Sequence, residues 1–156
     1  MHTILAIAAF VVLAFLPNQA AAQNQTVNRL TQQQFAQILT QGGFKSEVVA
    51  SGNDKMVRVS LPKSKFTASV VFYNCSALGC TSYRIVAWDT SKALNTAFAN
   101  AWNAQYLFTK AYIDDEGDFA FTYDIDMSGG ITQNAIKVSA SLFDALLIEL
   151  AQFNPK

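Results

Sequence analysis

The chain contains a single histidine among its 156 residues, and that histidine is His2. Without an imidazole in the rest of the chain, a Ser-His or Cys-His nucleophile and a histidine-ligated zinc ion are excluded there. The remaining side chains include no group that titrates near neutral pH at its unperturbed pKa. The sequence therefore predicts no catalytic residue, no cofactor and no metal site.

An excess of either charge is also lacking. The chain has 11 Lys and Arg against 11 Asp and Glu, for a formal net charge of +0. Proteins that bind nucleic acids or anionic membranes attract them through clustered basic side chains. The sequence has no basic stripe or basic tail, so we do not expect a nucleic acid as the partner.

An apolar run of 13 residues, Ile4 to Leu16, opens the chain and is followed by Pro17. Ala20 and Ala22 place small side chains where a signal peptidase reads them. Residues 1–22 are therefore predicted to be a signal peptide that is cut after Ala22, which would place the protein in the periplasm or outside the cell. The alternative is an uncleaved anchor, but a 13-residue helix is about 20 Å long against a hydrocarbon core of roughly 30 Å. No stable membrane insertion is expected after cleavage.

Cysteine is scarce, with two residues, Cys75 and Cys80. An even number of cysteines in an exported protein indicates a disulfide. A redox-active pair is the alternative, but it normally has a Cys-x-x-Cys spacing at the start of a helix. A bridge across so short a loop stabilises the fold by only roughly 2 kcal/mol, so its main effect would be to hold the register of two strands.

Caps and turn residues divide the chain into helices and strands. Thr31 and Gln34 form a capping box at the start of a helix that Gly42-Gly43 ends, and Thr132 can cap a long final helix. The prediction is a polar leader over 23–30 followed by one domain over 31–156. The domain begins with a helix from Thr31 and four strands, over 44–50, 55–61, 65–74 and 82–88. A helix over 91–105, strands over 108–114 and 119–125, and the final helix complete it. In the middle helix, Leu94, Phe98 and Trp102 form the predicted buried stripe. This order, α-β-β-β-β-α-β-β-α, predicts an α+β fold with three helices and an antiparallel sheet of about six strands.

Pairing Cys75 with Cys80 also predicts which side chains share a face of the sheet. Phe72 would lie opposite Tyr83, on the face that packs against the core. The other face is more apolar than a solvated surface requires, so it is a candidate partner surface. Its residues are Val71, Tyr73, Arg84, Val86 and Trp88. The alternative is that a second layer or a helix covers this face.

Six carboxylates lie between Asp114 and Asp126. Asp124, Asp126 and Ser128 match positions 1, 3 and 5 of an EF-hand calcium loop. Position 12 of that loop is Ala135, where an EF-hand has a bidentate glutamate. Turns of a hairpin and a loop are the favoured interpretation, and a weakly bound cation is the alternative.

The same acids could also be a catalytic pair. Glycosidases use two suitably spaced carboxylates and need no histidine. Asp114 with Asp118, or Asp124 with Asp126, could be nominated. Nothing at a solvent-exposed hairpin tip would separate the pKa values of the first pair, and no pocket is predicted around the second. A carboxylate-based hydrolase is therefore the least favoured function.

The block from residue 100 to residue 130 resembles the YbjN-domain family, described as bacterial sensory transduction regulators. The resemblance covers nearly all of the chain after the signal, and it implies a fold similar to that of type III secretion chaperones, without an established catalytic residue. In this sequence the family motif is carried by Asn100, Trp102, Asn103, Ala111, Tyr112, Asp114, Glu116, Gly117, Asp118, Asp126, Gly129 and Gly130. Gln105-Tyr106 departs from the family, which often has an arginine near the phenylalanine.

These observations together predict an exported, non-enzymatic binding or regulatory module. We expect a protein or peptide partner on the outer sheet face or in a groove between helix and sheet, and a homodimer is possible. The alternative is a sensor of a small ligand or cation that uses the acidic hairpin, residues 114–126.

Overall fold

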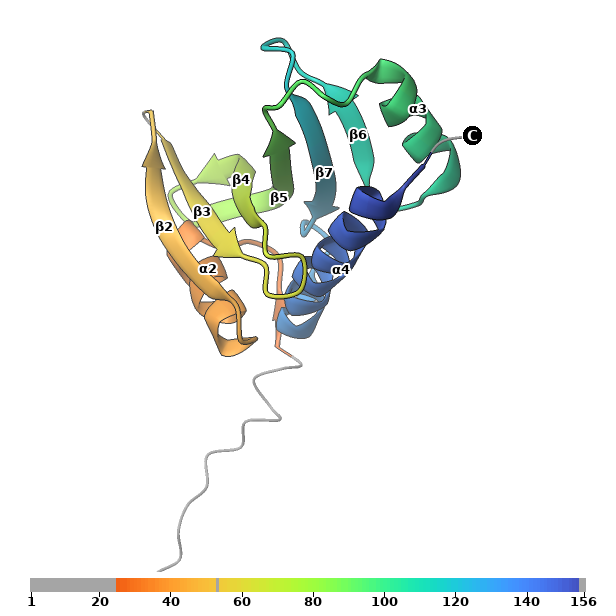
Figure 1. The fold of residues 1–156 in the computed structure, drawn as a ribbon. Helices are drawn as coiled ribbons and strands as arrows, with labels where there is room; N and C mark the ends of the chain where they lie inside the picture. Colours follow the sequence, from red (N-terminus) through yellow and green to blue (C-terminus); the bar gives the residue numbers. More distant parts are fainter. Residues whose placement is uncertain (1–24, 53, 155–156) are drawn as a thin grey trace, which may run out of the picture.

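Six strands form one antiparallel sheet in the order β2-β3-β4-β5-β7-β6 (Figure 1). They are β2 (Lys45–Ser51), β3 (Asp54–Ser60), β4 (Thr67–Ser76), β5 (Gly79–Asp89), β6 (Lys110–Ile113) and β7 (Phe119–Asp126). A separate two-stranded sheet pairs β1 (Thr26–Val27) with β8 (Ile131–Thr132). The computed structural model describes residues 25–52 and 54–154, so the predicted signal peptide lies outside the described residues.

Three helices complete the described part of the chain and confirm the predicted α+β class. They are α2 (Gln32–Gln41), α3 (Thr96–Gln105) and α4 (Gln133–Gln152). The predicted caps are present, because the Thr31 hydroxyl accepts from the Gln34 N–H and the Thr132 hydroxyl accepts from the Ala135 N–H. Figure 1 shows α4 running diagonally across the sheet, with α2 beside β2 and α3 beside β6.

The register of β4 and β5 agrees with the prediction. Phe72 lies opposite Tyr83, and Cys75 lies opposite Cys80 with their Cα atoms 3.9 Å apart. The two sulfur atoms are at disulfide-bonding distance. The side chains of β4 and β5 therefore alternate between two faces as expected, and one of these faces carries the core.

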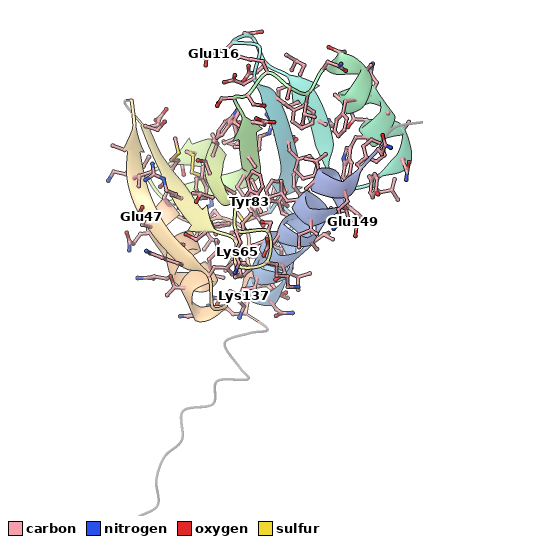
Figure 2. The ribbon with its side chains drawn as sticks, viewed as in Figure 1. Glu47, Lys65, Tyr83, Glu116, Lys137 and Glu149 are labelled. Atoms are coloured by element: carbon pink, nitrogen blue, oxygen red, sulfur yellow. A yellow bond between two sulfur atoms is a disulfide. The ribbon has the colours of Figure 1, made fainter. Side chains whose placement is uncertain are left out.

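The core lies between the inner sheet face and the helices, and Tyr83 is near its centre (Figure 2). The Phe35 ring of α2 packs against Tyr83 with ring centroids 4.6 Å apart. The Tyr83 hydroxyl is 2.9 Å from the Ser139 hydroxyl of α4. Burial of this hydroxyl raises the pKa of Tyr83 well above its usual value, because the charged form loses its hydration. One side chain thus links β5 to two helices.

The middle helix begins later than the sequence pattern indicated. Asn95 caps α3 by accepting from the Phe98 N–H, at 3.0 Å. Leu94 therefore precedes the helix, so its predicted place in α3 is wrong, although its side chain packs against the core as Phe98 does. An asparagine side chain that satisfies a free backbone donor is a stronger start signal than an apolar residue four positions before the next one.

The segment predicted as a polar leader makes contacts with the rest of the chain. Leu30 is buried and exchanges two backbone hydrogen bonds with Cys80, of 2.9 and 3.0 Å. At Gly79, an added Cβ would lie 2.7 Å from the Leu30 backbone. At Gly130, which has φ +86°, an added Cβ would lie 2.8 Å from Thr26. Gly79 and Gly130 therefore leave room for the N-terminal segment to approach.

None of the described helices has the length and hydropathy that a membrane-spanning helix needs.

Candidate binding site

The outer sheet face carries accessible aromatic side chains, and one of them, Trp88, also lines a pocket at the end of β5. Tyr73 is 43% exposed and Trp88 is 42% exposed, while Val71 and Arg84 are half-buried. Val86, however, is only 1% exposed, so its prediction as a surface residue is wrong. Val86 is smaller than Arg84 and Trp88, which lie two positions away on the same strand face, so alternation along a strand does not by itself give exposure.

An ion pair occupies the middle of this outer face. Arg84 on β5 donates to both carboxylate oxygens of Asp124 on β7, at 2.5 and 2.9 Å. The hydrogen bonds that Arg84 donates to Asp124 raise the pKa of Arg84 above its usual value. The guanidinium also lies 5.8 Å from the ring centre of Tyr73, in cation–π range. Two of the polar groups that could have recognised a partner are thus already paired with each other.

A pocket of about 320 Å³ lies where β4 separates from β5, beside the C-terminal end of α4. Small-molecule and side-chain binding pockets usually start near this size. The lining is almost entirely apolar. It consists of Phe66, Ala87, Trp88, Asp89, Leu94, Phe98, Phe119, Leu147, Leu150, Ala151 and Phe153.

Aromatic packing holds the wall of this pocket in place. Phe98 of α3 makes edge contacts with Phe119 of β7 and with Phe153, with centroid distances of 5.7 and 5.3 Å. Phe153 also contacts the fully buried Trp102, at 5.4 Å. Because these rings contact each other in pairs, the wall is preformed rather than assembled by a ligand.

Phe66, on the opposite rim, is positioned by a buried carboxylate. Asp144 of α4 is 1% exposed and accepts from the backbone N–H groups of Lys63 and Ser64, at 3.0 and 2.8 Å. These bonds fasten the β3–β4 loop, which ends at Phe66, to the helix. Asp144 was not among the residues predicted for a site. An acidic residue within the apolar stripe of a helix, between Ala140 and Leu147, was the available signal.

Asp89 is the one acidic side chain among the described residues that line the pocket. Hydrogen bonds from Ser91 lower its pKa, so this carboxylate is ionised at neutral pH. No ion-pair partner of Asp89 is found within residues 25–52 and 54–154. The pocket is thus an apolar cavity with one negative charge.

Two members of the 100–130 motif, Trp102 and Asn103, have structural roles. The Trp102 Nε1–H donates to the buried Thr109 hydroxyl at 3.1 Å. The Asn103 side chain bonds both backbone groups of Ala111, and Tyr112 lies exposed on the outer face. Asn100 is exposed on α3, and nothing in its surroundings explains its place in the motif.

Three acidic members of the motif have local partners. Asp114 and Asp126 accept hydrogen bonds within turns, and Asp118 forms an ion pair with Lys92. One Asp114 oxygen accepts from the N–H groups of Glu116 and Asp118, at 3.1 and 2.8 Å, and Gly117 supplies the positive φ of this turn. Asp126 accepts from the backbone and hydroxyl of Ser128, which lowers its pKa. Figure 2 shows Glu116 at the tip of the β6–β7 hairpin. In the described part of the chain, no three acidic, cysteine or histidine side chains gather as a metal site would require.

A second apolar feature lies at the turn between α3 and β6. Phe108 was predicted to begin a strand, but it lies in this turn with φ 72° and is 67% exposed. Leu107 beside it is also exposed. Tyr106, the preceding residue, stacks on Trp102 with centroids 3.8 Å apart. Leu107 and Phe108 therefore follow a residue that is fixed by stacking. Neither of them lines the pocket.

Comparison with known proteins agrees with this fold. The YbjN family model, described as "Putative bacterial sensory transduction regulator", matches residues 31–152. A solved structure titled "Crystal structure of YbjN, a putative transcription regulator from E. coli" is similar, with a TM-score of 0.58 and 16% identity over 82% of this chain and 95% of that chain. At this identity the likeness shows the fold alone. No curated protein matches the chain.

Proposed function

Because the chain belongs to the YbjN family, whose description is that of a regulator and not of an enzyme, we propose that it is an exported, non-enzymatic binding module. Its partner is a protein that presents an apolar segment. The binding site is the pocket between β5, α3 and α4, with Trp88 at its rim. This site corresponds to the expected groove between helix and sheet, and not to the middle of the outer sheet face.

The observation that carries this proposal is the preformed apolar pocket of about 320 Å³ next to two exposed aromatic side chains, Phe66 and Trp88. Exposed aromatic residues beside a desolvated pocket are typical of binding hot spots. The outer face is a weaker candidate, because Val86 is buried and Arg84 is bonded to Asp124.

Export is supported by two features. The apolar run of residues 4–16 followed by small residues has the form of a cleavable signal. The sulfur atoms of Cys75 and Cys80 are at disulfide-bonding distance, and disulfides persist in oxidising compartments. On this proposal the protein acts in the periplasm or outside the cell with residues 1–22 removed.

The test is an array of immobilised peptides, each with a bulky apolar residue, probed with the protein lacking residues 1–22. Trp88→Glu should reduce binding about ten-fold or more, because it places a charge at the apolar rim. Tyr73→Glu is the matched control, since Tyr73 is equally exposed at 43% but does not line the pocket. Unchanged circular dichroism spectra would show that both variants fold.

The results separate the two surfaces. Loss of binding in Trp88→Glu and retention in Tyr73→Glu would support the pocket. The reverse pattern would move the site to the outer face, and binding to no peptide at all would refute the proposed function.

A further inference from the structure

We propose that the pocket recognises an extended peptide segment in which a bulky apolar residue is next to a lysine or arginine. The apolar side chain fills the cavity, the cation pairs with Asp89, and the peptide backbone lies along Trp88 and Asp89 at the end of β5. This inference rests on the proposed function and specifies the partner's chemistry.

The strand edge beside the pocket favours an extended peptide. The pairing of β5 with β7 continues to Asp89, which lies opposite Phe119. The pairing of β5 with β4 ends at Val86, opposite Ser69. Ala87 is buried, so the accessible edge is Trp88 and Asp89, where β5 has a partner strand on one side only within the described part of the chain. A segment that lies along a free strand edge gains main-chain hydrogen bonds, while pockets beside the edge select its side chains.

The negative charge of Asp89 favours a basic residue next to the apolar residue of the bound peptide. Asp89 is ionised and lines a cavity whose other side chains are apolar. The closest basic residue in sequence, Lys92, is bonded instead to Asp118 and to the Glu116 carbonyl. An acidic group entering the pocket would meet an uncompensated negative charge in a partly desolvated site, whereas a cation would be attracted.

The test uses four synthetic peptides with identical flanks and central pairs Phe-Lys, Phe-Met, Phe-Glu and Ala-Lys. Affinities are measured by titration of the protein lacking residues 1–22. We expect Phe-Lys to bind most tightly, about five-fold better than Phe-Met, and Ala-Lys to bind weakly. Asp89→Asn should abolish the preference for Phe-Lys over Phe-Met. An amide oxygen can still accept from the Ser91 N–H, so this variant keeps the local turn.

Several outcomes would overturn the inference. Equal binding of Phe-Lys, Phe-Met and Phe-Glu would overturn it but leave the proposed function standing, whereas binding of none would refute both. Unchanged affinity of a Phe-Lys peptide with N-methylated backbone amides would exclude pairing along β5. Phenethylamine binding as tightly as Phe-Lys would assign the pocket to a small amine. Self-association that Trp88→Glu abolishes, with no binding of the Phe-Lys peptide, would assign it to a second copy of this chain.

Discussion

The Asn103 side chain hydrogen-bonds both backbone groups of Ala111, with its amide nitrogen donating to the carbonyl and its oxygen accepting from the N–H, at 2.8 Å each. Ala111 lies in β6, at one edge of the sheet. A side-chain amide thus takes the place of a further strand and protects this edge against pairing with another chain. The motif asparagine is therefore explained by the architecture of the sheet.

Replacement of Asn103 should lower the free energy of unfolding. Asn103→Ala leaves the two Ala111 groups without their partner, so we expect a loss of about 1–3 kcal/mol in the free energy of unfolding. Urea denaturation would measure it. Asn100→Ala, three positions earlier on the exposed face of α3, should change the stability by less than about 0.5 kcal/mol. Equal losses in both variants would argue against the role assigned to Asn103.

Asp144 is expected to be a larger determinant of stability. Asp144→Ala removes the acceptor of two backbone donors in the β3–β4 loop, and we expect a loss of about 2–4 kcal/mol. Hydrogen exchange should also become faster at the amides of Lys63 and Ser64, whose protection depends on this carboxylate. Glu149→Ala, on the exposed side of the same helix, is the control and should leave both measurements unchanged.

The two adjacent motif glycines should respond differently to alanine. Gly130→Ala forces a Cβ onto a residue with φ +86° and into contact with Thr26, so we expect a loss of about 1–3 kcal/mol. Gly129→Ala meets no heavy atom within 4 Å and has no positive φ, so it should be nearly neutral. Gly117→Ala, with φ +80° and only the Lys92 amine nearby, measures the backbone strain alone. If Gly130→Ala cost no more than Gly117→Ala, the contact with β1 would be energetically unimportant.

Alkaline pH should destabilise the fold through Tyr83. Its pKa is raised in the folded state, so the folded protein retains the proton that the unfolded chain releases. The stability is full below the unfolded pKa of about 10 and then falls by roughly 1.4 kcal/mol per pH unit until the folded pKa is reached. Tyr83→Phe removes this dependence at a cost of about 1 kcal/mol at neutral pH, and Ser139 can still donate to the Ile136 carbonyl. Parallel stability profiles of the two proteins above pH 10 would contradict this assignment.

Sequence patterns predicted helix starts and strand register well where the residues that determine them are close together in the chain. The capping box at Thr31 and the cap at Thr132 are present, because each cap involves residues three positions apart. The register of β4 and β5 followed from one assumed pair, Cys75 and Cys80, because antiparallel pairing propagates along two strands. The start of α3 was missed, since Leu94 continued an apolar spacing that Asn95 interrupts.

The candidate site was predicted less completely than the fold. Trp88 was identified as accessible from strand alternation alone, and it is exposed. Alternation could not show that Val86 on the same face is buried, or that Asp144 of α4 fastens the loop that ends at Phe66. These relationships join residues that are far apart in the chain, and no short sequence pattern encodes them.

The sequence by itself determined the class of fold, the order of its elements apart from the short strands β1 and β8, the neutral charge and the absence of histidine chemistry after His2. Each of these depends on composition or on residues within a few positions of each other. Only the tertiary structure decided that the pocket lies where β4 leaves β5. Its lining joins residues as far apart in the chain as Phe66 and Phe153, and Asp89 is its one acidic side chain. The reason is physical, because a cavity is the space left between packed elements, and its shape depends on how their side chains meet.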